Sequence, residues 1–203
     1  GATSAARCRH ATNMLTETEF LVFNAVYLKK MVAAAQIVEM TGIGADDVAR
    51  CLEDATTRGW VMDMGADGVM VLDDGAAEVL KHYAEAYVQQ RQDPAMTAWY
   101  HGFEALNMRF IAAVTQWQES DGDSTAERRL LQAAERLAKD IALLMPSIPR
   151  YAGYVGRLER SMERVDLGER DFVCNPTVDS VHNVWFEFHE DILTVLGRKR
   201  DTT

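Results

Sequence analysis

The stretch GADDVARCLEDATTRGW, residues 44–60, decides the fold of the first half of the chain. Its apolar residues recur at every third or fourth position, which is the spacing of one buried helical face. They are Val48, Leu52 and Ala55. Gly59 is expected to end this helix, because glycine readily adopts the positive φ of a helix C-terminus. The first turn carries Asp46 and Asp47, so the helix begins with two negative charges.

The sequence before this helix predicts two more. LTETEFLVFNAVYLKK, residues 15–30, has apolar residues at helical spacing behind a capping box formed by Thr16 and Glu19. VAAAQIVEMTG, residues 32–42, is a shorter amphipathic segment that ends at Gly42. A tight turn then leads into the helix within 44–60. The predicted order is therefore helix, helix, tight turn, helix.

The sequence after this helix predicts a β-hairpin. WVMDM, residues 60–64, and VMVLDD, residues 69–74, are strand-like runs on either side of the turn GADG. The dipeptide Asp67-Gly68 is a strong signal for such a turn. A hairpin in this position would form the wing of a winged helix-turn-helix.

Residues 16–81 resemble the MarR-like winged helix-turn-helix of bacterial regulators. In that pattern a Gly-marked turn leads into the recognition helix, a Gly-aromatic-Val step opens the wing, and a Leu-to-Leu segment with a central Gly follows it. The matching residues here are Ala35, Ile37, Gly42, Ile43, Val48, Leu52, Gly59, Trp60, Val61, Leu72, Gly75 and Leu80. The chain departs from the pattern at Ala55, Asp73 and Asp74. The resemblance implies a DNA-binding transcriptional regulator.

The charge of this segment argues against that function. Residues 16–81 hold 12 acidic and 5 basic side chains, and the whole chain has a formal net charge of −10. DNA affinity depends on Lys and Arg that displace counterions from phosphates, and the hairpin has neither. Asp46 and Asp47 either complement the positive end of their helix or repel nucleic acid and leave the helix for a protein partner. The candidate DNA- or partner-binding residues are Gly44, Ala45, Asp46, Asp47, Arg50, Arg58 and Asp67.

The second half of the chain predicts an antiparallel helical bundle. After Gly75, residues 76–92 read as a connecting helix with Val79, Leu80 and Tyr83 inward. Apolar stripes at helical spacing then mark four further helices, the second of which opens with a Ser124/Glu127 capping box. They fall within residues 97–118, 124–145, 147–165 and 177–197.

The fold class expected for the chain is therefore mostly α with a small β-hairpin wing. The expected organisation is a tail or cloning remnant at 1–15 with Met14 as a natural start, a winged helix-turn-helix at 16–81, a connecting helix and linker at 82–97, and a four-helix bundle at 98–200. FEALNMRFIAAVTQWQ and VDSVHNVWFEFHEDILTVLGRKR are also similar to the C-terminal half of a bacterial family that carries a winged helix in front. Some relatives of that family occur beside phosphoenolpyruvate-utilising enzymes, but the resemblance implies no biochemical role and no catalytic residue.

The densest set of polar and aromatic residues predicts a small-molecule pocket inside the bundle. Its candidate residues are His101, Glu104, Arg109, Trp117, His182, Trp185 and His189. The same aromatic residues are also typical of a dimer interface, so that alternative stays open. The pairs Asp179/His182 and His101/Glu104, each at i and i+3, match a carboxylate-histidine metal site poorly, so we expect no metal.

No motif for a catalytic nucleophile, a phosphate loop or a cofactor is present, so we expect no catalytic residues, no cofactor and no enzyme activity. The three cysteines are far apart and read as ordinary thiols. No signal peptide or membrane-spanning run is visible, which predicts a cytoplasmic protein that does not bind membranes. We expect a homodimeric transcriptional regulator that senses a small molecule through its helical half. The alternative is a non-enzymatic adaptor whose acidic winged helix binds a protein, for example a metabolic enzyme, instead of DNA.

Overall fold

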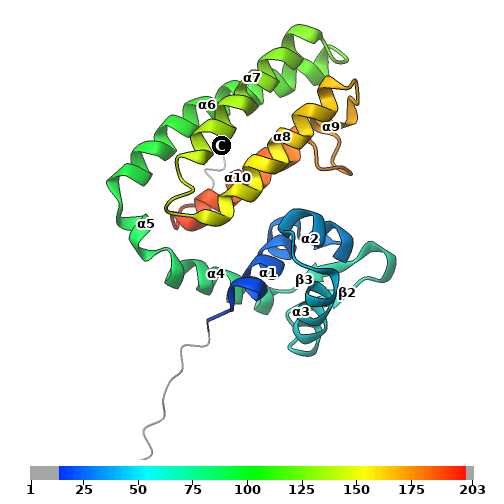
Figure 1. The fold of residues 1–203 in the computed structure, drawn as a ribbon, viewed down its shortest axis with the longest axis vertical. Helices are drawn as coiled ribbons and strands as arrows, with labels where there is room; N and C mark the ends of the chain where they lie inside the picture. Colours follow the sequence, from blue (N-terminus) through cyan, green and yellow to red (C-terminus); the bar gives the residue numbers. More distant parts are fainter. Residues whose placement is uncertain (1–13, 200–203) are drawn as a thin grey trace, which may run out of the picture.

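The structure is a computed structural model that describes residues 14–199. Figure 1 shows an elongated molecule with a small N-terminal unit at one end and a helical bundle at the other. The predicted class, mostly α with a small β-hairpin, is confirmed. Most of the expected N-terminal tail, residues 1–13, lies outside the described part of the chain.

The N-terminal unit, residues 17–86, is built on the three helices that the sequence predicted. α1 (Glu17–Lys29) opens with the expected capping box, because the side chains of Thr16 and Glu19 each accept from the other's backbone N–H. α2 (Ala34–Thr41) ends at Gly42, whose φ is 71°. α3 (Ala45–Thr57) buries the predicted apolar face, Val48, Leu52 and Ala55, against α1 and α2.

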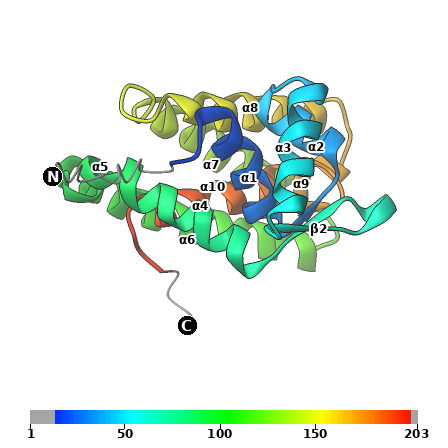
Figure 2. The ribbon, with the colours of Figure 1, turned by 90° about the horizontal axis from the view of Figure 1, so that it is seen from below.

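The hairpin is part of a three-stranded antiparallel sheet. β2 (Val61–Asp63) and β3 (Val69–Val71) form the predicted hairpin, and a 3₁₀ turn, Gly65–Asp67, joins them. β1 (Met31–Val32), which sequence analysis did not predict, pairs with the other side of β3 and gives the order β1-β3-β2. A Cβ on Gly68 would lie 2.2 Å from the carbonyl oxygen of Val32, so only glycine allows the hairpin to approach β1 this closely. Figure 2 shows the hairpin projecting away from the helices.

The connecting helix differs from the prediction in three ways. α4 (Asp73–Ala86) begins two residues before Gly75, which lies inside its first turn. The helix is interrupted at Tyr87, so that the shorter α5 (Val88–Gln92) follows as a separate element. Leu80, expected to face inward, is 44% exposed, whereas Val79 and Tyr83 are buried as predicted.

The bundle consists of α6 (Pro94–Glu119), α7 (Ser124–Ala142), α8 (Ala152–Asp166) and α10 (Val181–Val195). A 3₁₀ turn, Pro149–Tyr151, precedes α8, and the short α9 (Asp171–Cys174) lies in a segment expected to be irregular. The predicted capping residue of α7, Ser124, is wrong, because Asp123 accepts from the backbone N–H of Ala126 instead. α10 starts four residues later than predicted because Ser180 caps it.

The two ends of the molecule share one continuous core. α10 packs against α1 and α4 of the N-terminal unit, and α2 contacts α8. Buried apolar side chains run without interruption from Phe20 in α1 to Phe188 in α10 and Leu137 in α7. The N-terminal unit is therefore held against the bundle rather than joined to it only through α4 and α5.

Candidate functional site

The exposed face of α3 is the first candidate site, and it lacks available cations. Asp46, Arg50 and Glu53 are exposed on this helix, and Gly44 and Ala45 form its beginning. Arg50 forms an ion pair with Asp47 one turn away. Arg58 pairs with Asp54 at 2.7 Å and stacks its guanidinium 4.7 Å from the centre of the Trp60 ring. Both predicted cationic contacts are thus engaged by carboxylates of their own helix.

The hairpin continues this acidic surface and adds exposed methionines. Asp67, the last of the predicted contact residues, lies in the turn at the hairpin tip. Met31, Met70 and Met62 sit side by side across the three strands, because Met70 is the register partner of both others. Met31 is 46% and Met62 is 47% exposed, whereas the alternating valines face the core. We call these three residues the methionine row.

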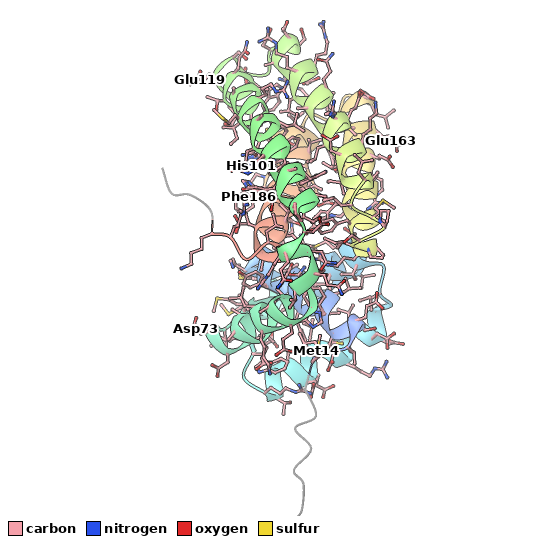
Figure 3. The ribbon with its side chains drawn as sticks, turned by 90° about the vertical axis from the view of Figure 1, so that its left-hand side faces the viewer. Met14, Asp73, His101, Glu119, Glu163 and Phe186 are labelled. Carbon is pink, nitrogen blue, oxygen red and sulfur yellow. The ribbon has the colours of Figure 1, made fainter. Side chains whose placement is uncertain are left out.

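The predicted pocket residues fall partly into one place. A groove of about 580 Å³ runs between α6 and α10, and we call it the aromatic groove. Four of the seven predicted residues line it, together with Tyr100, Asn107, Met108, Phe110, Ile111 and Phe186; the four are Glu104, His182, Trp185 and His189. His101 does not line the groove but bonds Glu104 at its edge, with 3.1 Å between Nδ1 and Oε2. Figure 3 shows His101 and Phe186 on the same side of the bundle.

Trp185 forms the inner wall of the aromatic groove. Its ring stacks on Phe110 with 3.8 Å between the centroids, and its Nε1–H donates to Asn107 at 2.8 Å. The side chain is only 2% exposed, so it belongs to the core as much as to the groove. Burial lowers the pKa of His182, which favours a neutral imidazole beside the tryptophan. The groove therefore offers aromatic surface with a few polar groups, which suits a small amphipathic molecule.

Two predicted pocket residues lie elsewhere. Arg109 is exposed on the side of α6 that faces α7, not α10. Trp117 is near the end of α6, where its Nε1–H donates to Glu127 at 3.1 Å and the Arg170 guanidinium lies 5.5 Å from its ring centre. Sequence periodicity predicted that both residues would face α10. They do not, because the side of α6 that faces α10 depends on how the helix is rotated in the bundle, and local spacing does not specify that rotation.

A buried ionic cluster, which sequence analysis missed, joins the N-terminal unit to the bundle. Asp191 in α10 is fully buried and accepts two hydrogen bonds from Arg150, at 2.5 and 2.6 Å. It also accepts from the hydroxyls of Tyr151 and Tyr154 and from the Asn24 amide of α1. Burial raises the pKa of both tyrosines, and the charge of Asp191 raises it further, so they remain protonated donors.

The second half of this cluster surrounds Arg157. Its guanidinium binds Asp179 at 2.6 and 3.0 Å and Glu187 at 2.6 Å. Lys29 of α1 binds the other oxygen of Glu187 at 2.5 Å. Asp179, expected on the same helix as His182, instead precedes α10 and serves as a partner of Arg157. We call these two groups together the ionic seam; it consists of Asn24, Lys29, Arg150, Tyr151, Tyr154, Arg157, Asp179, Glu187 and Asp191.

The ionic seam satisfies its own charges. Its three cations pair with three carboxylates: Lys29, Arg150 and Arg157 with Asp179, Glu187 and Asp191. The Tyr83 hydroxyl donates to the side-chain oxygen of Asn24 at 2.8 Å, so both ends of that amide are hydrogen-bonded. A cavity of about 340 Å³ between α1 and α8 borders Asn24, Arg150, Tyr154 and Arg157. Because those polar groups already bond within the seam, they fix the orientation of the two ends of the molecule. A weak sequence signal existed: Arg and Tyr cluster at 150–157, just after Pro149.

The described residues offer little else with obvious chemistry. Residues 14–199 contain no group of three or more His, Cys, Asp or Glu placed to hold a metal ion. Cys51 and Cys174 are free thiols, and burial raises the pKa of Cys174 to about 11, which keeps it protonated. No helix in the described part of the chain is both long and apolar enough to cross a bilayer.

Comparisons of this chain with protein-family models, with curated proteins and with solved structures find no match.

Proposed function

We propose that this protein is a non-catalytic regulatory adaptor that binds another protein through the exposed face of α3 and the hairpin. The observation that carries the proposal is electrostatic. Residues 45–74, which contain α3 and the hairpin, hold eight acidic and two basic side chains, and both bases are ion-paired with carboxylates of α3. A surface with this charge repels phosphates, whereas a protein partner with basic side chains would complement it.

The methionine row supports a protein partner as well. Methionine is flexible and polarisable, and it is common at surfaces that adapt to another protein. The row spans three adjacent strands, and neighbouring strands lie roughly 4.8 Å apart, so its side chains cover a width of about 10 Å, with Met31 and Met62 exposed and Met70 half-buried between them. That width matches one partner helix. A DNA-binding wing would instead need a cation to enter the minor groove.

The ionic seam and the aromatic groove suggest how such an adaptor would be regulated. The seam fixes the N-terminal unit on α10, and the groove lies between α10 and α6. A small amphipathic molecule in the groove would change the packing of α10 and, through the seam, the position of α1. We therefore assign the groove the sensing role.

The second candidate function is DNA binding by a transcriptional regulator. The order of three helices and a hairpin favours it, as does the exposed position of α3 behind the turn at Gly42. In this function Arg50 would leave its pair with Asp47 to contact a phosphate. The resemblance of residues 16–81 to MarR-like regulators supports the same candidate.

One pair of measurements separates the two functions. A photo-crosslinking amino acid replaces Ala49, on the exposed face of α3, or Ala84, an exposed alanine of α4 that serves as the control. We expect Ala49 to crosslink to one protein in an extract of the source cells and Ala84 not to do so. In parallel, genomic DNA fragments are selected on the purified protein at low salt.

Recovery of specific DNA fragments, with binding that falls steeply as salt increases and weakens in Arg50→Ala, would establish the regulator instead. Equal crosslinking from Ala49 and Ala84 would also count against the adaptor. Recovery of no DNA, together with a product specific to Ala49 that mass spectrometry identifies as this protein joined to a different protein, would support it. A product that contains only copies of this protein would indicate self-association and count against the adaptor.

A further inference from the structure

A groove lined by arginines lies between α6 and α7, on the side of α6 away from the aromatic groove. Its volume is about 460 Å³. Its buried floor consists of short or apolar side chains, Leu106, Ala113 and Ala133, which let another backbone approach closely. Its rim carries three guanidiniums and two amides; they belong to Arg109, Arg129, Arg136, Gln116 and Gln132. We call this the arginine groove.

The positive charge on the rim of the arginine groove is only partly neutralised by carboxylates among the described residues. Arg136 binds Asp140 through Nε alone, at 2.9 and 3.0 Å, so its two terminal nitrogens donate to no residue that the structure describes. Among the described residues, Arg129 bonds only the neutral amide oxygen of Gln116, at 3.3 Å. Arg109 forms no ion pair with any residue in 14–199. In a chain whose net charge is −10, this concentration of exposed cations favours an anionic occupant.

The spacing of the arginines indicates a helical occupant. Arg129 and Arg136 lie seven residues apart on α7, which is two helical turns or about 10.5 Å. A groove between two packed helices accepts a third helix, and a carboxylate pair with the same spacing would face the two arginines. The occupant should also present small residues between those carboxylates, because the short or apolar side chains of the groove floor let another backbone approach closely.

The exposed face of α3 meets these requirements. Asp46 and Glu53 are seven residues apart, exposed, and without an ion pair to any residue that the structure describes. Ala49 lies between them on the same face. Figure 1 shows α3 and the α6–α7 turn at opposite ends of the molecule, so α3 cannot reach the arginine groove of its own chain.

We propose that the arginine groove binds α3 of a second copy of this protein, with Asp46 and Glu53 opposite Arg129 and Arg136. The two faces lie on different parts of the chain, so the contact is heterologous, and copies add in series unless a ring closes. The proposal does not depend on the adaptor function, because it needs no other protein. Since it covers α3, self-association would compete with any partner or DNA that uses the same face.

The two possible uses of α3, self-association and DNA binding, predict opposite effects of replacing Arg50. It is exposed on the same face of α3 and would lie near the cations of the groove. Arg50→Ala removes that repulsion and frees the carboxylate of Asp47, so it should strengthen self-association. The same substitution should weaken DNA binding if the protein is a DNA-binding regulator.

The experiment is sedimentation velocity of the full chain over a range of concentrations at about 50 mM salt, where exposed charges are weakly screened. The wild type should show an average mass that rises with concentration. Asp46→Arg/Glu53→Arg and Arg129→Glu/Arg136→Glu should each weaken association about tenfold or more, because each places like charges opposite one another. An equimolar mixture of the two should associate again, since one keeps an intact α3 and the other an intact groove.

Arg160→Glu/Arg164→Glu, on α8, is the control that makes the same change in net charge away from the groove. It should associate like the wild type. Circular dichroism and thermal unfolding confirm that each variant is folded. A wild type that stays monomeric at every concentration, equal losses in the α8 control, or a mixture that fails to associate would overturn the proposal.

Discussion

Removing the charge of Asp191 should cost more stability than any other single isosteric change in the ionic seam. Asp191→Asn preserves the size of the side chain, so no cavity forms, but it leaves Arg150 without its carboxylate. The Asp191 side chain is 0% exposed and that of Arg150 is 11% exposed, so water cannot replace the lost partner. Leaving one buried charge unpaired costs about 3–5 kcal/mol, which is a large part of the stability of an ordinary domain.

The assay is urea unfolding followed by circular dichroism, from which the free energy of unfolding and its urea dependence are both obtained. Asp179→Asn is the matched control. Asp179 also binds an arginine, but its side chain is 35% exposed and Arg157 keeps Glu187, so we expect a loss of about 1 kcal/mol or less.

A second variant tests the cause directly. Adding Arg150→Met to Asp191→Asn removes the unpaired guanidinium, while the amide oxygen at position 191 still accepts from the Tyr151 and Tyr154 hydroxyls, so the double variant should recover part of the loss. The reasoning is refuted if Asp191→Asn loses no more than Asp179→Asn, or if the double variant is as unstable as the single one.

Three further predictions concern pH, the sheet and the aromatic groove. Burial lowers the pKa of His82 and of His182 below 6.5, so these histidines bind protons more readily in the unfolded chain than in the folded one. The free energy of unfolding should therefore fall as pH drops below about 6.5, and replacing both histidines with Phe should weaken that dependence. Gly68→Ala should lose more than about 1 kcal/mol in urea unfolding, because its Cβ would clash with the Val32 carbonyl; no loss would contradict the β1 pairing. Trp185→Ala should lose about 3–5 kcal/mol in the same assay, and a smaller loss would show that the indole is not part of the core.

Phe186 is a better residue than Trp185 for testing whether the aromatic groove binds a small molecule. Because Trp185 is part of the core, its loss would disturb folding and ligand binding together. Phe186 lines the same groove and is 46% exposed, so Phe186→Ala changes the groove with less effect on packing. Thermal shifts of wild type and Phe186→Ala with a set of small amphipathic molecules would then report on the groove itself.

Local sequence patterns predicted the N-terminal helices well, because their signals act over a few residues. The capping box at Thr16, the stop at Gly42 and the buried face of α3 each depend on spacing within one turn or two. β1 was missed because two residues carry no periodicity, and their pairing depends on β3, which lies about forty residues further along the chain. The start of α10 was misplaced because Ser180 caps the helix inside a run that continues the apolar spacing.

The charge balance also depends on tertiary contacts. Composition alone showed that the N-terminal unit is acidic. Composition did not show that Lys29 forms an ion pair with Glu187 in α10. Nor did it show that Arg129 and Arg136 of α7 line one groove with Arg109 of α6. Each of these pairings joins residues from separate helices, and no local spacing specifies which helices become neighbours.

By itself, the sequence determined the helical class, the hairpin and the acidic character of α3, because periodicity, caps, turns and charge are local properties. Only the tertiary structure decided that Asp191 would lie at the junction of the two ends, and that the predicted pocket residues would divide between two sides of α6. The physical reason is that burial and pairing of polar groups depend on helix rotation and packing, which are settled when the whole core closes.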